Sequence, residues 1–452
     1  MLSILANRTY RNLFAAQVLS LIGTGLTTVA LGLLAYEIAG AEAGQVLGIA
    51  LAIKMIAYVG VSPFAGAIAG WVPRRAFLVT LDVVRAGMVL LLPFVTEVWQ
   101  IYALVFLFQS CSAAFTPTFQ ATIPDVLPDE KEYTAALSMS RLAYDLESLL
   151  SPLLAALLLT LISFHWLFLG NAIGFLASGL LVLSVVLPVA RTVQRPFLER
   201  LTRGTWIYFA TPRLRGLLAL SFAAASSGAM VIVNTVVIVR AGFGGSEGDV
   251  AWFFAAYGLG SMIVALALLR LLDAKSPRAV MIGGALVLPL LLAAGAFAMT
   301  WWSILVIWFL LGAAASAIMT PAGILLRRSA HPEDRPSIFA AQFALSHAGW
   351  LVTYPLAGWL GANWGMSVAF FVLAAGAAVG ALAATALWPA NDPEIIEHDH
   401  EEIEHSHPLD AESDHAPPVE DHTPGSQRHR HKAVRHAHSF VIDDHHQVWP
   451  KP

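Results

Sequence analysis

Apolar residues fill the first 390 positions of the chain in long runs that short polar breaks interrupt. A helix needs about 20 consecutive, mostly apolar residues to cross the hydrocarbon core of a bilayer. The pattern therefore predicts twelve membrane-spanning helices, at residues 11–37, 45–70, 76–95, 99–122, 134–163, 165–188, 214–240, 250–272, 278–298, 302–328, 337–362 and 366–388. The expected fold class is an all-α membrane protein.

The longest polar break, residues 190–213, divides these helices six and six. We predict an N-terminal six-helix bundle over residues 1–189, a linker over 190–213 and a C-terminal six-helix bundle over 214–390. Residues 391–452 form a separate polar tail. Proline and glycine interrupt regular structure in this tail, so we expect a disordered chain; they lie at Pro408, Pro417, Pro418, Pro424 and Gly425.

The two halves repeat each other. Thr116-Pro117 recurs as Thr320-Pro321, and Pro128-Asp129-Glu130 recurs as Pro332-Glu333-Asp334, both at an offset of 204 residues. Six is an even number of helices, so both repeats run in the same direction across the membrane. We therefore expect two parallel repeats related by an axis along the membrane normal.

Basic residues orient the chain in the membrane. They gather in alternate loops, whereas the loops between them offer little more than Arg240. Cytoplasmic loops carry the excess of Lys and Arg, so both termini should be cytoplasmic. The basic loops contain Arg8, Arg11, Arg74, Arg75, the five arginines of the linker, Lys275, Arg278, Arg327, Arg328 and Arg335.

Composition excludes several classes of protein. Hydrophobic residues make up 57% of the chain, charged residues 12%, and the mean hydropathy is +0.69, outside the range of soluble domains. The single cysteine, Cys111, rules out disulfides and multi-thiolate metal sites. No phosphate loop, nucleophile elbow or HExxH motif occurs, so we expect no enzyme, no ATPase, no resident cofactor and no nucleic-acid partner. Transport driven by an ion gradient remains.

The segment from Phe64 to Arg75 resembles the gating loop of the major facilitator transporters, with Gly66, Arg74 and Arg75 at matching positions. This resemblance covers residues 1 to about 389 and implies two six-helix bundles that alternate access to a central site. Gly70 stands where that motif usually has an acid. The charge relay attributed to the loop is then in doubt unless Asp82 and Arg85 supply it.

The tail holds 12 of the 15 histidines of the chain, interleaved with carboxylates. Imidazole nitrogen and carboxylate oxygen suit Ni²⁺, Co²⁺, Zn²⁺ or Cu²⁺, so the tail should bind a divalent metal. The alternative is a tract that is only polar and unstructured. The candidate ligands are His398, His400, His405, His407, His415, His422, His429, His431, His436, His438, His445 and His446. The apolar segment from Phe440 to Trp449 could dock on the cytoplasmic face of the body.

Several short segments, among them residues 7–14, 30–37 and 234–240 and the end of the tail at 438–450, look like the NreB-type nickel-resistance exporters. This resemblance implies proton-coupled efflux of Ni²⁺ across a bacterial inner membrane, with Co²⁺ as a second substrate. The expected partners are the metal ion, protons and the lipid bilayer, and a monomer is expected. Two alternatives stay open, namely a siderophore or drug exporter with a metal-buffering tail and a metal sensor that has lost transport.

Ionisable residues inside the membrane are costly, so each is a functional candidate. Arg141 and Asp145 are spaced i and i+4 and can neutralise each other. Glu147 is rotated about 200° from Asp145 around the helix and cannot easily share that pair. Glu147 could couple transport to protons, or it could pair with Lys54 and only hold two helices together.

His347 lies near mid-membrane in the helix that corresponds to that of Glu147 in the repeat. It is a candidate metal ligand, and a packed interhelical histidine is an equal alternative. Neutral polar residues on other helices are candidates for lining the path, and interhelical hydrogen bonding is their alternative role. These are Gln17, Thr28, Gln109 and Asn234.

Overall fold

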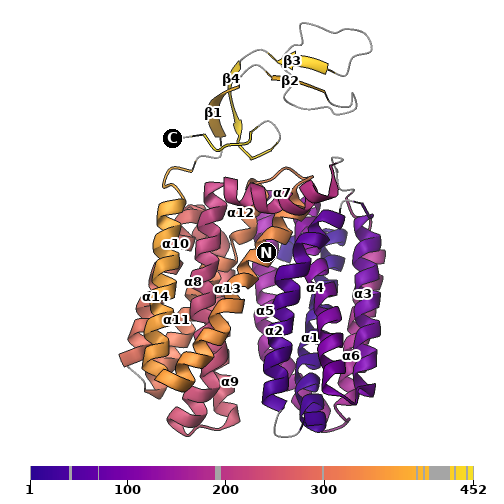
Figure 1. Ribbon diagram of the computed structural model, residues 1–452, viewed down its shortest axis with the longest axis vertical. Coiled ribbons are helices and arrows are strands. Elements are labelled where there is room, and N and C mark those ends of the chain that lie inside the picture. The colour runs from indigo at the N-terminus through magenta and orange to yellow at the C-terminus, as the bar shows by residue number, and fades with distance from the viewer. Residues whose placement is uncertain are drawn as a thin grey trace.

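The structure is a computed structural model. It describes residues 2–39, 43–69, 71–188, 195–297, 300–392, 395–400, 403–406, 428–431, 434–443 and 446–450. Two helical bundles stand side by side, and the short strands of the C-terminal tail lie beyond one end of them (Figure 1). This is the end at which the linker between the bundles also lies, and we call it the linker end.

The N-terminal half begins with a 3₁₀ helix, η1 (Leu2–Ala6). Its main helices are α1 (Arg8–Ala39), α2 (Ala43–Ile68), α3 (Arg74–Leu91, extended by the 3₁₀ turn η3, Leu92–Phe94), α4 (Val98–Val126), α5 (Glu130–Leu159) and α6 (His165–Leu183). α1 packs against α6 and α5, α2 against α4, and α3 against α6 and α4. Buried aliphatic and phenylalanine side chains fill the space between these helices.

The C-terminal half contains α8 (Pro212–Val237, continued by the π-helical turn η4, Ile238–Gly242), α9 (Glu247–Ala274), α10 (Pro277–Phe297), α11 (Trp301–Met319), α12 (Ala322–Arg328), α13 (Arg335–Trp364) and α14 (Met366–Leu387). α11 and α12 together occupy one predicted span. α8 packs against α14 and α13, α9 against α11, and α10 against α14 and α11. This is the N-terminal packing pattern repeated, so the prediction of twelve helices in two parallel six-helix repeats is confirmed.

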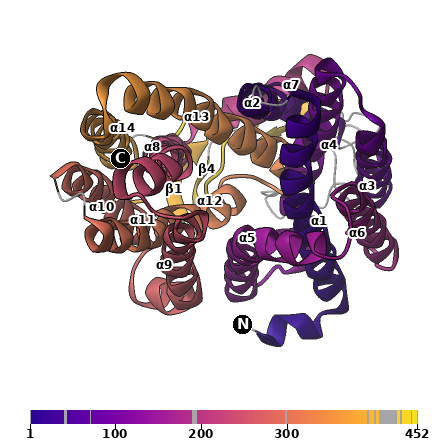
Figure 2. The same cartoon turned by 90° about the horizontal axis from the view of Figure 1, so that it is seen from below.

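Ten helices within the described part of the chain are long and apolar enough to cross a membrane. α5 and α13 are equally long but more polar, and they are the helices that carry Glu147 and His347. Figure 2 shows why polarity is tolerated there, because α5 lies beside α9 and α13 beside α2, on the two sides of the interface between the halves. Their polar side chains therefore need not face lipid.

The segment predicted as a linker contains a helix that the polar break does not predict, α7 (Phe197–Ala210). α7 packs across α13 and α2 and so touches both halves. Arg203, Ile207 and Tyr208 are buried on its inner face. The linker is therefore packed against the linker end of both bundles rather than extended into solvent.

The tail contains regular structure that the sequence analysis does not predict. Strand β1 (Ile395–His400) pairs antiparallel with β4 (Val434–Ser439), and β2 (Ile403–Ser406) pairs with β3 (Arg428–His431). Between the start of β1 and the end of β4, the prolines of the tail lie at positions 408–424, between β2 and β3, and leave both arms free of proline. Strands can pair there because no residue of either arm lacks a backbone N–H.

Residues 440–442 dock on the C-terminal half, as the apolar character of this segment predicts. Phe440, Val441 and Ile442 are 3%, 6% and 1% exposed, and Phe440 and Ile442 belong to the main hydrophobic core of that half. Burying an aliphatic or aromatic side chain of this size contributes about 1.5–3 kcal/mol. The end of the chain is therefore fixed to the body.

Candidate functional site

One polar cluster lies between α2 and α13, where the two halves meet. The Tyr58 hydroxyl donates to Gln109 Oε1 at 3.0 Å, and Lys54 Nζ lies 5.5 Å from the centre of the Tyr58 ring. The imidazole of His347 packs edge-on against Tyr58 at 4.8 Å and beside Phe343 at 4.2 Å. His347 Nδ1 lies 2.7 Å from the Phe343 carbonyl oxygen, so Nδ1 carries the proton and donates. That bond leaves Nε2 as the nitrogen with a lone pair, which is how proteins commonly orient a metal-binding histidine.

Glu147 lies on α5 against α1. A Cβ placed on Gly25 would lie 2.5 Å from Glu147 Oε1 and 2.1 Å from Ser151 Oγ, so only glycine lets the carboxylate sit this close to the α1 backbone. The described residues contain no ion pair within 4 Å between Glu147 and Lys54. Lys54 lies against the Tyr58 ring, on which His347 also packs.

Arg141 and Asp145 form the predicted i, i+4 pair, with Nη2 and Oδ1 3.0 Å apart. Arg141 Nε also donates to Ser261 Oγ of α9 at 2.8 Å. This pair therefore joins α5 to α9 across the interface between the halves. The charges of Arg141 and Asp145 satisfy each other, so the geometry is that of a structural contact.

Asp82 and Arg85 do not take part in a relay at the gating loop. They pair with each other inside the N-terminal half, where Asp82 is 0% and Arg85 4% exposed. Ser178 Oγ donates to Asp82 Oδ2 at 2.8 Å, and the Arg85 guanidinium stacks on Phe115 at 4.0 Å. The geometry assigns this pair to holding α3, α4 and α6 together.

The neutral polar candidates make hydrogen bonds between or within helices. Ser140 donates to Gln17 Oε1 at 3.0 Å, and Thr28 donates to the Thr24 carbonyl oxygen one turn earlier. Asn234 is 2% exposed and donates to the Ala357 carbonyl oxygen at 3.2 Å, which ties α8 to α13. Asn234 is therefore buried in packing, while Gln109 remains part of the Tyr58 cluster.

The gating-loop residues lie at the linker end. Arg74 is buried and pairs with Asp125 at the end of α4, and Arg335 of the C-terminal half pairs with the other oxygen of the same carboxylate. A Cβ on Gly66 would already lie 2.7 Å from the Cβ of Ala340 on α13. Arg75 is exposed, and Gly70 is outside the described residues. Asp125 is thus the acid that joins Arg74 to the opposite half.

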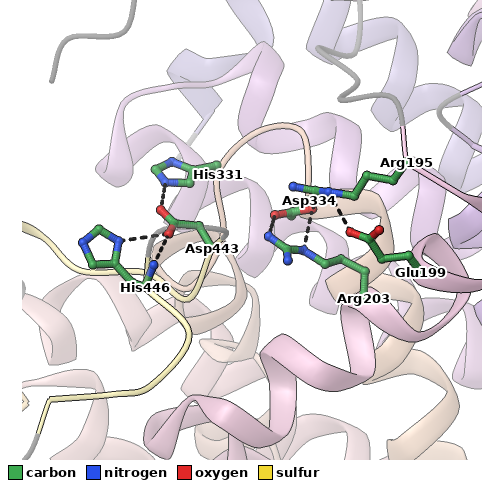
Figure 3. A network of polar contacts seen from close by, with 7 residues as sticks. All are labelled: Arg195, Glu199, Arg203, His331, Asp334, Asp443 and His446. Carbon is green, nitrogen blue, oxygen red and sulfur yellow. Dashed lines mark hydrogen bonds and ion pairs between the residues drawn. The ribbon is translucent and has the colours of Figure 1, made fainter. Parts of the chain in front are cut away.

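A second set of charges lies at the linker end, outside the gating-loop motif. Glu130 pairs with Arg328 of the other half, and Asp334 pairs with Arg195 and Arg203 of the linker (Figure 3). Glu130 and Asp334 are separated by 204 residues, the offset of the internal repeat. The repeat was the signal that could have identified them.

Beside these charges, the tail contacts the α12–α13 loop through Asp443 (Figure 3). Asp443 Oδ2 lies 3.3 Å from His331 Nε2 in the α12–α13 loop, and Oδ1 lies 3.0 Å from His446 Nδ1. The hydrogen bond to Asp443 raises the pKa of His331 above its usual range, and burial only partly opposes it. Burial disfavours ionised Asp443, but the bonds from His331 and His446 outweigh it and hold its carboxyl pKa well below its usual range.

The candidate metal-binding histidines fall into three groups. His398, His400, His405, His429, His431, His436 and His438 lie on the four strands, and His446 lies in the docked segment. His407, His415, His422 and His445 are outside the described residues. In the described part of the chain, no three His, Cys, Asp or Glu side chains converge so as to hold a metal ion.

Three comparisons place the chain among known proteins. No curated protein sequence matches it. Solved structures of similar fold include the human organic anion transporter MFSD10 (TETRAN; TM-score 0.73, 13% identity, 84% of this chain and 99% of that one). A bacterial homologue of the iron transporter ferroportin in the outward-facing state aligns with a TM-score of 0.69 at 15% identity, over 84% and 99%. The E. coli fucose:proton symporter FucP aligns with a TM-score of 0.66 at 14% identity, over 84% and 98%.

At these identities the solved structures show the fold alone. The sequence itself matches the Major Facilitator Superfamily model over residues 13–233 and again over 216–432. The first match covers the N-terminal half, the linker helix and most of α8, and the second covers the C-terminal half and part of the tail. The chain is therefore a membrane-spanning member of the Major Facilitator Superfamily of transporters.

Proposed function

We propose that this transporter exports a divalent transition metal, Ni²⁺ first and Co²⁺ more weakly, by alternating access driven by proton influx. The observation that carries this proposal is the tail, with 12 histidines in the last 62 residues of a chain whose body has three. Nitrogen and oxygen ligands suit both ions, which are neighbours in the affinity order of divalent metals. An organic substrate would give no reason for such a tail.

In this proposal the linker end faces the cytoplasm of a bacterium and the helices cross its inner membrane. The basic residues support this orientation, because Arg74, Arg75, the arginines of α7, and Arg327, Arg328 and Arg335 all lie at or beside that end. Both termini are then cytoplasmic. The tail would meet metal ions on the side from which they are to be removed.

The transport path in this proposal uses the middle of the interface between the halves. Glu147 serves as the proton-coupling carboxyl, because it is half-buried and has no ion pair among the described residues, and an unpaired charge inside the membrane is costly enough to favour proton uptake. His347 offers Nε2 to the metal. Binding a cation requires deprotonated ligands, so metal and proton compete for these groups, and their exchange couples the two fluxes.

A second candidate is an exporter of an organic anion, siderophore or drug, with a tail that only buffers metal. The lack of three converging metal ligands among the described residues favours it. Transport by inverted vesicles separates the two candidates. Only the metal exporter should take up radioactive nickel in exchange for protons that leave the vesicle. An exporter of organic molecules should instead transport its organic substrate normally when the tail carries no metal ligand.

Nickel accumulation in cells tests the proposal directly. Cells that express the chain should accumulate less Ni²⁺ than control cells that do not express it. Equal accumulation in both, with membrane insertion verified, would remove the proposed function. Cobalt should show the same effect at a smaller size.

Truncation after Ala390 should weaken nickel resistance without abolishing it. A tail raises the local metal concentration at the mouth of the path by an effective-concentration effect, but it does not form the path. The measurement is the nickel concentration that halves growth. Complete loss of transport in a truncated protein that still inserts would place the tail inside the path.

A further inference from the structure

An apolar groove lies on the surface of the C-terminal half, where α13 and α14 both pack on α8 (Figure 2). Its volume is about 470 Å³, within the range of about 300–1,000 Å³ that small-molecule sites occupy. Val352 of α13 and Val379 of α14 line the groove and are exposed, so it opens outward between these two helices. Because both helices cross the bilayer, the opening faces lipid.

Small residues leave the space open. The lining includes Ala219, Ala348, Gly349, Gly380 and Ala383. A Cβ on Gly380 would lie 2.6 Å from the Ala219 carbonyl oxygen, so glycine lets the backbones of α14 and α8 approach closely at this point. The rest of the lining consists of leucine, valine and phenylalanine and one arginine. The groove therefore offers an almost wholly apolar surface to a bound chain.

The groove lies in the half of the membrane at the linker end. On α8 its lining runs from Arg215 to Phe222, and on α14 it runs from Val379 to Leu387, the last residue of that helix. At the rise of an α-helix these stretches measure about 10–12 Å. One leaflet contributes about half of the 30 Å hydrocarbon core. The groove therefore spans most of one leaflet, as the acyl chain of a lipid does, and does not cross the membrane.

Arg215 lies at the linker end of this groove. Among the described residues that line the groove, it is the only one with a polar side chain. It makes no ion pair with the described residues, and its buried Nε has no hydrogen-bond partner among them. Arg213, which lies about 200° around the same helix, has Asp392 at 3.7 Å instead. A buried donor without a partner is rare in proteins, so an anion from outside the chain is the expected partner of Arg215.

We propose that the groove binds an anionic phospholipid, with one acyl chain along α8 between α13 and α14 and the headgroup phosphate at Arg215. A guanidinium matches the geometry of phosphate oxygens and can donate two parallel hydrogen bonds to them. The apolar lining suits the chain, and Arg215 lies at the end of the membrane span, where headgroups begin. In the orientation of the proposed function this is the cytoplasmic leaflet, and the inference depends on that function only for the name of the leaflet.

The groove is separate from the polar cluster between the halves. Ala348 and Val352 line it from one side of α13, whereas His347 on the same helix packs against Tyr58 of α2. A bound lipid therefore contacts α13 away from the candidate metal ligand. Lipid binding can then be measured without metal, so its failure would leave the proposed export intact, and loss of export would leave the lipid site intact.

Native mass spectrometry of the detergent-solubilised full-length protein tests the role of the charge. The probes are phosphatidylglycerol and phosphatidylcholine with the same acyl chains, of which only the first has a net negative charge. The first phosphatidylglycerol should bind about fivefold more tightly, which corresponds to about 1 kcal/mol for one basic residue at an anionic surface. Arg215→Gln should remove this preference, and Arg215→Lys should keep most of it because the charge remains.

Arg270→Gln is the matched control, because Arg270 is exposed near the same end of α9 and lies outside the groove. It should leave the preference unchanged. A preference that survives in Arg215→Gln, or equal binding of both lipids by the unaltered protein, would overturn the proposal. Glycerol phosphate carries the anion without a chain and should not displace bound phosphatidylglycerol. Displacement would identify a site for free anions and would also overturn the proposal.

Filling the groove tests the place of the acyl chain. Ala383→Leu adds bulk to the lining and should weaken the binding of both lipids about fivefold or more, since overpacking costs about 1–3 kcal/mol. Ala386→Leu is the control, because Ala386 is exposed on the same helix outside the lining. Ala348→Leu repeats the test from α13, and an unchanged thermal unfolding temperature without added lipid verifies folding. Unchanged lipid binding in both filled variants would overturn the proposal.

Discussion

The interface between the two halves has two regions that differ in how their charges are satisfied. At the linker end, Asp125 lies between Arg74 and Arg335, and Glu130 pairs with Arg328. In the middle, the described residues show no ion pair for Lys54 or Glu147. The Glu130–Arg328 pair is partly exposed, so it is worth little and can separate into water, whereas the pairs of Asp125 are largely buried and cost more to break. Unpaired charge at mid-membrane is costly and is kept where a proton or ligand can neutralise it.

Replacing Glu147 by Gln should have the largest effect and stop proton-coupled transport. The amide keeps the size of the side chain but cannot exchange a proton. Glu130→Gln makes the same chemical change on the same helix at the linker end. It should destabilise the contact between the two halves there by only about 0–1 kcal/mol. Inverted vesicles with independently varied pH and nickel measure both variants.

Normal transport by Glu147→Gln with an unchanged pH profile would make Glu147 structural. The proton site would then have to be sought at Asp145 or Asp82. The lack of an ion pair for Glu147 among the described residues would then have no role in proton coupling.

Replacing His347 by Ala should raise the KM for nickel by about 10–100-fold and leave the pH profile intact, because a neutral nitrogen ligand is lost while the carboxyl still titrates. Tyr58→Phe is the control, since it keeps the ring that packs on His347 and removes only the hydroxyl. A lower kcat with unchanged KM would instead indicate that His347 packs the interface and does not bind the metal.

Replacing Asp125 by Asn should weaken the contact between the two halves at the linker end by about 1–3 kcal/mol, because a neutral amide cannot satisfy two guanidinium groups. Ala340→Cys in a Cys111→Ser background reports opening through its rate of modification by a thiol reagent. Asp129→Asn is the control at the same end, since Asn caps α5 as well as Asp does. Equal rates in the two variants would show that Asp125 does not hold the halves together.

The smallest effect should come from pH at the docked tail. The pKa of His331 is raised, so its charged contact with Asp443 stabilises docking at low pH and is lost as pH rises through that pKa. Glu333 and Asp334 act in the same direction, and the exposure of His331 limits the effect to about 1 kcal/mol or less. A spin label at Gln447→Cys in the Cys111→Ser background should become more mobile as pH rises, and in His331→Gln its mobility should not depend on pH.

Local sequence could predict the helices and the repeat because membrane spans are set by composition and length, which need no partner. The Arg141–Asp145 pair was equally predictable, since its spacing along one helix fixes its geometry. The apolar character of residues 440–442 predicted that they dock on the body. The strands of the tail were harder to predict, because pairing joins residues 22 to 44 positions apart and prolines lie between them.

The charges at the linker end depended on tertiary structure. Asp125 lies at the end of α4, far in sequence from Arg328 at the end of α12 and Arg335 at the start of α13, and only the meeting of the two halves makes one acid serve two arginines. The same holds for Asp82 and Arg85, whose role followed from the packing of α3 on α4 and α6 and not from their nearness to the gating loop. Sequence alone determined which residues are costly in a membrane, because that cost is a property of each side chain. The tertiary structure decided which of them are neutralised, because neutralisation is a property of the neighbours.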